Sequence, residues 1–367
     1  MFNKIKWEVI VTNNKVELKQ IMRFAGAFIA FLIGSGFATG QEIMQYFVVY
    51  GYMGIVGIIV MFVLLLYVNV KFITAGYEHK NSRRYDIYSF YCGRKVGQFY
   101  NYFIIVFSFM SVVVMIAGAG ATINQQYGLP IYFGCIIMAI LSGCTVIFGL
   151  NKIVDIIGII GPLIALLSIL LGLSAVLKNP NGLRTANEFI PTLKQMKAST
   201  NWLFASLSYV GFSILWLASF LSSMGKIANS KKEAVFSAIA GVSAFSLSVL
   251  IVALGLLANI EQVAGTMIPS LILARNINPA VAKIFSLTVV AGIYTTAVPL
   301  LWTVSSRAAD EKSKKYKITT VGLTIAGTLI SLNVPFDILI NIVYGFNGYI
   351  GLLFLILMIS KSIKIKI

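Results

Sequence analysis

The chain has 367 residues, of which 58% are hydrophobic and only 11% are charged. A soluble domain of this size cannot hide so much apolar surface, so the composition predicts an all-α integral membrane protein. The formal net charge of +17 lies mostly in short segments between apolar runs, which is typical of topology signals and does not indicate a nucleic-acid partner. One histidine and three scattered cysteines leave little material for metal-dependent or histidine-based catalysis, so we expect neither an enzyme nor a cofactor.

Ten apolar runs are long enough to cross a bilayer, which takes roughly twenty residues of α-helix. They cover residues 21–50, 52–73, 99–126, 131–149, 152–177, 201–224, 233–259, 280–306, 317–334 and 337–360. With the N-terminus inside, the cytoplasmic segments hold 23 of the 29 lysines and arginines. Basic residues favour the cytoplasmic side, so we expect cytoplasmic termini and a multi-pass protein of the cell membrane.

The ten spans divide into two halves of five. An odd number of spans per half makes the halves point in opposite directions, which predicts an inverted repeat. The expected organisation is a cytoplasmic segment 1–20, a first repeat 21–177, an extracellular loop 178–200, a second repeat 201–360 and a cytoplasmic tail 361–367. Another outer segment, 260–279, is also longer than a turn requires. Both outer segments are either lids over a cavity or plain linkers.

The first span, from Phe24 to Tyr50, is interrupted in its middle by Gly34-Ser35-Gly36. Glycine costs about 1 kcal/mol in a helix interior, which a simple membrane anchor would avoid. Irregular backbone at membrane depth is tolerated only where it lines a cavity or packs in protein. We therefore interpret residues 34–36 as an unwound hinge whose backbone faces a ligand. A glycine notch for a neighbouring helix is the alternative.

The sixth span opens the second half as the first span opens the first half. It carries the run Ser206-Leu207-Ser208-Tyr209-Val210-Gly211-Phe212-Ser213. Glycine-interrupted segments in corresponding positions of inverted repeats point to the central site of a transporter. We therefore expect a second broken helix here. Ordinary hydrogen bonding between helices is the alternative role for the serines.

The eighth span contains the run Ala291-Gly292-Ile293-Tyr294-Thr295-Thr296. Hydroxyls beside a glycine, together with carbonyls of an unwound first span, supply oxygen ligands for a small cation such as sodium. Threonines in helices also bond back to their own backbone and bind nothing, so both interpretations stay open.

The GSGFATGQE run of the first span, the SLSYVGFS run of the sixth and the AGIYTT run of the eighth resemble the amino acid–polyamine–cation superfamily of transporters. The first-span run is most similar to that of the amino-acid permease branch. The resemblance covers nearly the whole chain in the number and order of spans. It implies ten transmembrane helices in a five-plus-five inverted repeat with helices 1 and 6 broken.

The sodium:neurotransmitter symporters of that superfamily have a GLG-type break, an SLS-x-G run and an AGLTSS run at the matching places. This similarity implies a sodium ion held by the carbonyls of Ala30, Ile33 and Ala291 and by the hydroxyl of Thr295. It also implies a substrate carboxylate at the backbone of the break and a substrate side chain near the sixth span. The expected substrate-binding set is Gly34, Ser35, Gly36, Phe37, Ser206, Ser208, Tyr209, Gly211, Phe212 and Thr296.

Tyr294 departs from the symporter pattern, because a second small hydroxyl ligand usually stands there. This departure leaves the implied sodium site one ligand short. Some proton-coupled relatives place a lysine of the fifth span in the ion site. Here the fifth span has no lysine after Lys152, which favours sodium over the proton as the coupling ion.

Glu42, next to Gln41, follows the break in the first span. A carboxylate in hydrocarbon costs at least about 2.5 kcal/mol on insertion scales, so a role is expected for it. We expect Glu42 and Gln41 to act in gating or proton transfer. Glu42 is then a proton carrier, an outer-gate partner of Arg275 or Arg184, or a group that selects cationic ends of substrates. A structural acid paired with Gln41 or with the backbone is the alternative.

The function expected from these features is cation-coupled secondary transport of a small amino acid or related amine by alternating access. Phe37, Tyr209 and Phe212 would enclose an apolar side chain, which favours a neutral substrate. The alternative is a membrane nutrient sensor that keeps the fold without transporting, since a sensor needs no intact cation site. The expected partners are the small-molecule substrate and the lipid bilayer, and the sequence does not indicate an oligomeric state.

Overall fold

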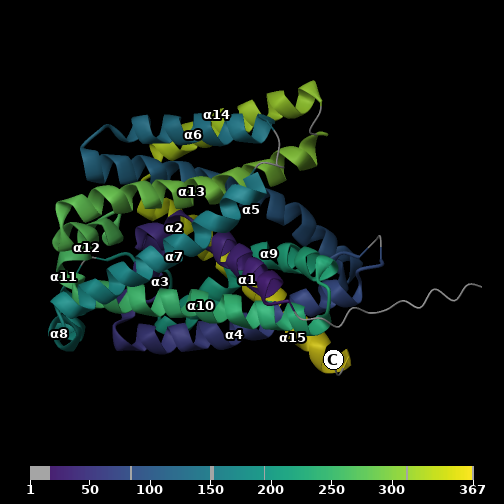
Figure 1. The fold of residues 1–367 in the computed structure, drawn as a ribbon, viewed down its shortest axis with the longest axis horizontal. Helices are drawn as coiled ribbons and strands as arrows, with labels where there is room; N and C mark the ends of the chain where they lie inside the picture. Colours follow the sequence, from purple (N-terminus) through teal and green to yellow (C-terminus); the bar gives the residue numbers. More distant parts are fainter. Residues whose placement is uncertain (1–16, 83–84, 149–152, 194, 311–312, 366–367) are drawn as a thin grey trace, which may run out of the picture.

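The computed structural model describes residues 17–82, 85–148, 153–193, 195–310 and 313–365. Apolar runs and short turns alternate along the chain, and the result is a helical bundle (Figure 1). The elements are α1 (Leu18–Leu32), α2 (Ser35–Thr39), α3 (Gln41–Tyr46), η1 (Val48–Tyr50), α4 (Tyr52–Glu78), α5 (Ile87–Tyr127), α6 (Ile131–Phe148), α7 (Ile153–Lys178), α8 (Gly182–Phe189), η3 (Ile190–Thr192), α9 (Trp202–Ile227), α10 (Lys231–Ala258), α11 (Ile260–Val263), α12 (Pro269–Ile277), α13 (Pro279–Ala308), α14 (Lys314–Asn333) and α15 (Phe336–Ile365).

Within the described ranges, seven helices are long and apolar enough to cross a membrane, and a further apolar helix, Ile131–Ile147, is shorter. The seven are α4, α5, α9, α10, α13, the Gly161–Lys178 part of α7 and the Phe336–Ile363 part of α15. Their outward faces expose large apolar side chains such as Leu166, Leu170 and Ile284. A soluble monomer rarely exposes so much apolar surface, so this face is the one that lipid covers. The protein is a multi-pass membrane protein.

The short helices of the first span lie near the middle of the bundle (Figure 1). α1 packs against α10 and α7, and α2 contacts α5, α12 and α13. α9 packs against α4 and α15, while α5 packs against α13. α6 and α14 lie side by side at the edge of the bundle. The broken first span is therefore enclosed by helices from the whole chain.

The break predicted in the first span is present in the structure. α1 ends at Leu32, and Gly34 adopts an extended conformation (φ −96°, ψ −164°) before α2 begins. A second interruption follows at Gly40, whose φ of +81° is in the left-handed region that favours glycine. A Cβ at Gly40 would also lie 2.5 Å from Oγ of Ser270 on α12. Two glycines thus divide one apolar run into three short helices.

The prediction of a second broken helix is wrong. α9 runs as one continuous helix through the serine- and glycine-containing run of the sixth span. The hydroxyls of Ser206 and Ser213 each donate to the carbonyl four residues earlier in α9, at 2.7 and 2.8 Å. These bonds satisfy the hydroxyls without unwinding the helix. Serines at this position therefore gave no reason for a break.

Gly211 in the same run allows α9 to pack closely against α15. A Cβ at Gly211 would lie 2.0 Å from the carbonyl oxygen of Gly348 on α15, and a Cβ at Gly351 would lie 1.9 Å from the carbonyl oxygen of Gly211. Small residues on both helices let the two backbones approach closely, as is common in membrane bundles. Packing against α15 explains this glycine.

The outer segment 260–279 is not a plain linker. Its helix α12 buries Pro269, Ser270 and Leu271 and contacts α2, α3, α7 and α13. The side chain of Gln125 on α5 holds the start of α12 through both the N–H and the carbonyl of Ile268, at 3.0 and 2.9 Å. α12 therefore packs over the broken first span at the C-terminal end of α5.

Candidate functional site

The backbone at the break is held against α5. The N–H of Gly34 donates to the carbonyl of Leu32 (3.0 Å), and the N–H of Ser35 donates to the sulfur of Met115 (3.3 Å). A Cβ at Gly118 would lie 2.9 Å from Cβ of Ser35, so α5 approaches the break at van der Waals distance. Two of the N–H groups predicted to face a ligand therefore already have acceptors.

The side chain of Glu42 turns back onto the break. A Cβ at Gly36 would lie 2.1 Å from Oε2 of Glu42 and 2.9 Å from its Cβ, so glycine at position 36 leaves the space that the carboxyl fills. The interruption at Gly40 makes this return possible, because one straight helix would separate residues 36 and 42 by about 9 Å along its axis. Glu42 is buried, with 5% of its surface exposed, and lies close to Tyr209 on α9.

Arg275 is not the gate partner of Glu42 in this structure. Its Nη2 donates to the backbone carbonyl of Gln125, at 3.0 Å, and to the side chain of Gln126. Within the described part of the chain, the ion pair that forms joins Lys231 and Glu78. The buried carboxyl of Glu42 thus lies beside hydroxyl-bearing and apolar groups and has no ion-pair partner among the described residues.

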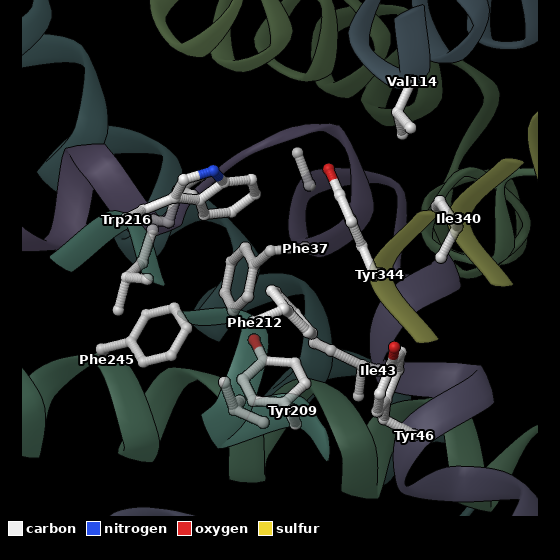
Figure 2. Packing of buried hydrophobic residues seen from close by; sticks show 14 of the residues in the cluster. Phe37, Ile43, Tyr46, Val114, Tyr209, Phe212, Trp216, Phe245, Ile340 and Tyr344 are labelled. Carbon is white, nitrogen blue, oxygen red and sulfur yellow. The ribbon is translucent and has the colours of Figure 1, made fainter. Parts of the chain in front are cut away.

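Aromatic side chains from three helices, α3, α9 and α15, lie close together in the buried core (Figure 2). We call Tyr46, Tyr209, Phe212, Trp216 and Tyr344 the aromatic cluster. The ring centroids of Tyr209 and Phe212 lie 4.9 Å apart, and Phe212 stacks on Tyr344 at 4.8 Å. Tyr46 meets Tyr209 edge-on at 5.4 Å. Phe37 of α2 contacts Phe245 at 5.6 Å and belongs to the same buried core as this cluster (Figure 2).

Four buried polar atoms at the break and in the aromatic cluster have no hydrogen-bond partner among the described residues. They are Oγ of Ser35, Oε1 of Gln41, the hydroxyl oxygen of Tyr46 and Nε1 of Trp216. A buried donor or acceptor left without a partner costs about 1–3 kcal/mol. Such atoms are typical of places where water or a ligand completes the hydrogen bonding.

Of the two adjacent threonine hydroxyls in the AGIYTT run of the eighth span, one reaches the break and the other does not. On α13, Thr296 donates to the carbonyl of Ile33 at 3.0 Å, so α13 and the end of α1 meet as the implied cation site requires. Thr295 instead donates to the carbonyl of Gly292 in its own helix, at 2.9 Å. The hydroxyl of Tyr294 lies 2.7 Å from that of Thr145 on α6, so its side chain leaves this region. The sodium set of Ala30, Ile33, Ala291 and Thr295 stays a prediction.

The predicted substrate-binding residues separate into two groups. Ser35, Gly36, Phe37, Tyr209 and Phe212 lie at the break or in the aromatic cluster, whereas three residues of α9 face other helices. Those three are Ser206, which lies against Gly57 of α4, Ser208, which lies against Gly348, and Gly211.

Several residues at this region escaped the sequence analysis, among them Tyr46, Met115, Trp216 and Tyr344. The spacing of Tyr209, Phe212 and Trp216 places all three on one helix face and could have revealed Trp216. Met115 and Tyr344 come from distant spans and had no local signal, whereas Tyr46 lies in the first span, four residues after Glu42.

Two cavities flank the break along α5. A polar cavity of about 560 Å³ lies at the end of α5 near the basic loops, lined by Tyr85, Asp86, Ile87, Gln98, Asn101, Tyr102, Ile105, Ser219, Ser222, Ser223, Lys226 and Arg307. A smaller cavity of about 210 Å³ lies toward the other end, lined by Ala117, Ala121, Ile131, Met267, Ser331, Leu332, Asn333, Val334, Pro335 and Phe336.

Aromatic rings stand between each cavity and the break. The rings of Phe107 and Trp216 stack at 4.8 Å one helical turn from the residues that line the larger cavity. On the other side, the Phe336 ring would lie 2.8 Å from a Cβ at Gly118, which also faces Ser35.

Comparison with known proteins identifies the fold. No protein-family model matches the chain. Two proteins of Bacillus subtilis (strain 168) are similar along nearly their whole length: the uncharacterized protein YyaD is 26% identical over 342 residues (91% of this chain and 95% of YyaD), and the uncharacterized membrane protein YkvI is 23% identical over 343 residues (93% of this chain and 95% of YkvI).

Among solved structures, MhsT in complex with L-phenylalanine superposes with a TM-score of 0.66 at 15% identity, covering 91% of this chain and 87% of MhsT. The fold of the chain is thus that of MhsT. A manganese transporter from Eremococcus coleocola superposes with a TM-score of only 0.46 at 16% identity, covering 96% of this chain and 75% of that chain.

Proposed function

We propose that this protein is a secondary active transporter that moves a small amino acid or related amine by alternating access, and that it is not an enzyme. The observation that carries the proposal is the break in the first span, which lies between cavities on opposite sides and holds a buried carboxyl. Irregular backbone and an intramembrane acid at the centre of a bundle mark solute pathways in transporters. The fold shared with MhsT supports the same conclusion.

The proposed architecture has ten spans in a five-plus-five inverted repeat, within the amino acid–polyamine–cation superfamily. Helix contacts support the repeat: α1 packs on α10 as α9 packs on α4, and α1 packs on α7 as α9 packs on α15. α5 packs on α6 as α13 packs on α14. Each pair matches a helix of one half with the same position in the other half. The basic loops give the proposed orientation, with both termini in the cytoplasm of a cell-membrane protein.

The substrate class follows from the region around the break. MhsT binds L-phenylalanine in the structure that resembles this chain. Here the aromatic cluster and Phe37 supply apolar surface for a side chain, and Glu42 supplies one charge. Sodium is the proposed coupling ion, because α13 meets the end of α1 through Thr296 and Ile33.

A membrane nutrient sensor is the second candidate function. It is supported by the residues at the implied cation site, which do not face one common point. The hydroxyl of Thr295 bonds within its own helix, and the Tyr294 side chain contacts α6. A sensor needs a ligand site but no ion coupling. Binding measurements alone do not separate the two functions, so transport has to be measured.

The experiment is a thermal stabilisation screen of detergent-purified protein with amino acids and amines, in sodium and in potassium, followed by uptake into proteoliposomes. A ligand at 100 times its Kd stabilises by about 2.7 kcal/mol, which is readily visible. The proposal predicts stabilisation by at least one member of the panel, more strongly in sodium, and its accumulation in vesicles. Stabilisation without any uptake, under a sodium or a proton gradient, would favour the sensor.

A further inference from the structure

When it is ionised, Glu42 has a negative charge that needs a counter-ion. Its carboxyl is buried against Gly36 and close to Tyr209, and it forms no ion pair within the described ranges. An uncompensated charge in a membrane interior is strongly unfavourable. The side chain therefore stays protonated unless a positive group binds beside it, and the described part of the chain supplies no such group.

The surroundings of Glu42 favour a cation of organic type. α1 ends just before Gly34, so its terminal carbonyls place the negative end of a helix dipole at the break. Tyr46, Tyr209 and Tyr344 lie close enough to Glu42 to interact with its charge. Faces of aromatic rings attract ammonium groups, and such rings enclose alkylammonium ligands in other proteins. A small hard cation would instead require several oxygen ligands.

The same geometry disfavours a substrate carboxylate at the break. The N–H groups of Gly34 and Ser35 already donate to Leu32 and Met115. The carboxyl of Glu42 lies directly at Gly36, so a second carboxylate there would meet like charge. The place that the family resemblance assigns to a carboxylate is therefore occupied by the protein's own acid.

We propose that this site binds the ammonium group of an organic amine, with Glu42 as its counter-ion and the aromatic cluster around its apolar part, and that the ligand needs no carboxylate. The inference rests on the proposed function and names the substrate class of the same site. Because the rings of the cluster are buried against one another, ligand entry requires them to move apart. The unpartnered atoms of Trp216 and Gln41 are then available for polar groups of the ligand.

The test compares three probes that share a phenyl ring and differ in charge: 2-phenylethylamine, L-phenylalanine and 3-phenylpropionate. Their Kd values are measured by calorimetry on the full-length purified protein in potassium chloride. The proposal predicts that 2-phenylethylamine binds at least as tightly as L-phenylalanine and that 3-phenylpropionate does not bind. Glu42→Gln, which keeps the side-chain size, is expected to weaken 2-phenylethylamine about ten- to hundredfold. Glu261→Gln, at an exposed position on α11, is the control with unchanged affinity.

The outcomes separate this inference from the proposed function. Binding and transport of L-phenylalanine with no binding of 2-phenylethylamine would overturn the inference and leave the transporter intact. Equal affinity of the wild type and Glu42→Gln for the amine would also overturn it. Stabilisation by sodium that Glu42→Gln abolishes, without amine binding, would assign an inorganic cation to Glu42 instead. Failure of every amine and amino acid to bind would overturn both. If Glu42→Gln does not fold, the probe series on the wild type decides alone.

Discussion

Gly36→Ala tests the contact between the break and Glu42. The added Cβ would lie 2.1 Å from Oε2 of Glu42, so the carboxyl must move by about 1.3 Å to restore an ordinary contact of 3.4 Å. The Cβ of Glu42, at 2.9 Å, cannot swing away as the carboxyl can. Overpacking of this kind costs about 1–3 kcal/mol. Without a clash, the same replacement in a helix stabilises by about 0.4–1 kcal/mol, because it restricts the unfolded chain.

The assay is thermal unfolding of purified protein, read by tryptophan fluorescence, for Gly36→Ala, Glu42→Ala and the double variant. We expect Gly36→Ala to lower Tm by about 2–6 °C and the double variant to recover part of the loss, since the Cβ at position 42 remains, with a coupling of about 0.5–3 kcal/mol. Gly322→Ala is the matched control, since its Cβ would meet no atom within 4 Å. A Gly36→Ala protein as stable as the wild type, or one destabilised equally with and without Glu42, would refute the contact.

Three further predictions follow from the packing. Gly211→Ala should destabilise by about 1–3 kcal/mol in thermal unfolding, and no side-chain rotation can relieve it, because the clash is with the α15 backbone; wild-type stability would contradict the close approach of α9 and α15. Thr296→Val removes a hydrogen bond between helices and should lower the free energy of unfolding by about 1 kcal/mol. If Thr295→Val loses more of the sodium-dependent stabilisation than Thr296→Val does, that result would support the sodium set implied by the resemblance. Two single-cysteine variants in a background without the native cysteines test the cavities, because Ser219 and Asn333 line different ones. Ser219→Cys should react with an impermeant thiol reagent added on the side of the basic loops, and Asn333→Cys with the reagent added on the opposite side. Labelling of both variants from one side would contradict the arrangement.

The sequence predicted the features that depend on composition and on glycine. Apolar run lengths gave most helix positions, and the run Gly34-Ser35-Gly36 gave the break, because two closely spaced glycines weaken a helix at membrane depth. The same argument failed at Gly211. There the glycine faces Gly348, more than a hundred residues away, and a close approach between helices leaves the same local signature as a hinge.

The position of the Glu42 side chain could not be predicted. It depends on the second interruption at Gly40, which separates α2 from α3 and lets the carboxyl reach Gly36. Of the two hydroxyls in the eighth span, that of Thr295 bonds to its own helix, while that of Thr296 reaches the end of α1. Which of two adjacent threonines faces a neighbour is set by helix rotation, and that rotation is decided by packing against distant spans.

Solute uptake tests the central claim most directly. The ligand that stabilises the purified protein most strongly is labelled, and its counterflow into proteoliposomes is measured for the wild type, Glu42→Gln and the exposed-site control Glu261→Gln. The account predicts accumulation with the wild type and the control and a strong loss with Glu42→Gln. Binding of the ligand with no flux through the wild type would contradict transport and leave a receptor with the same fold.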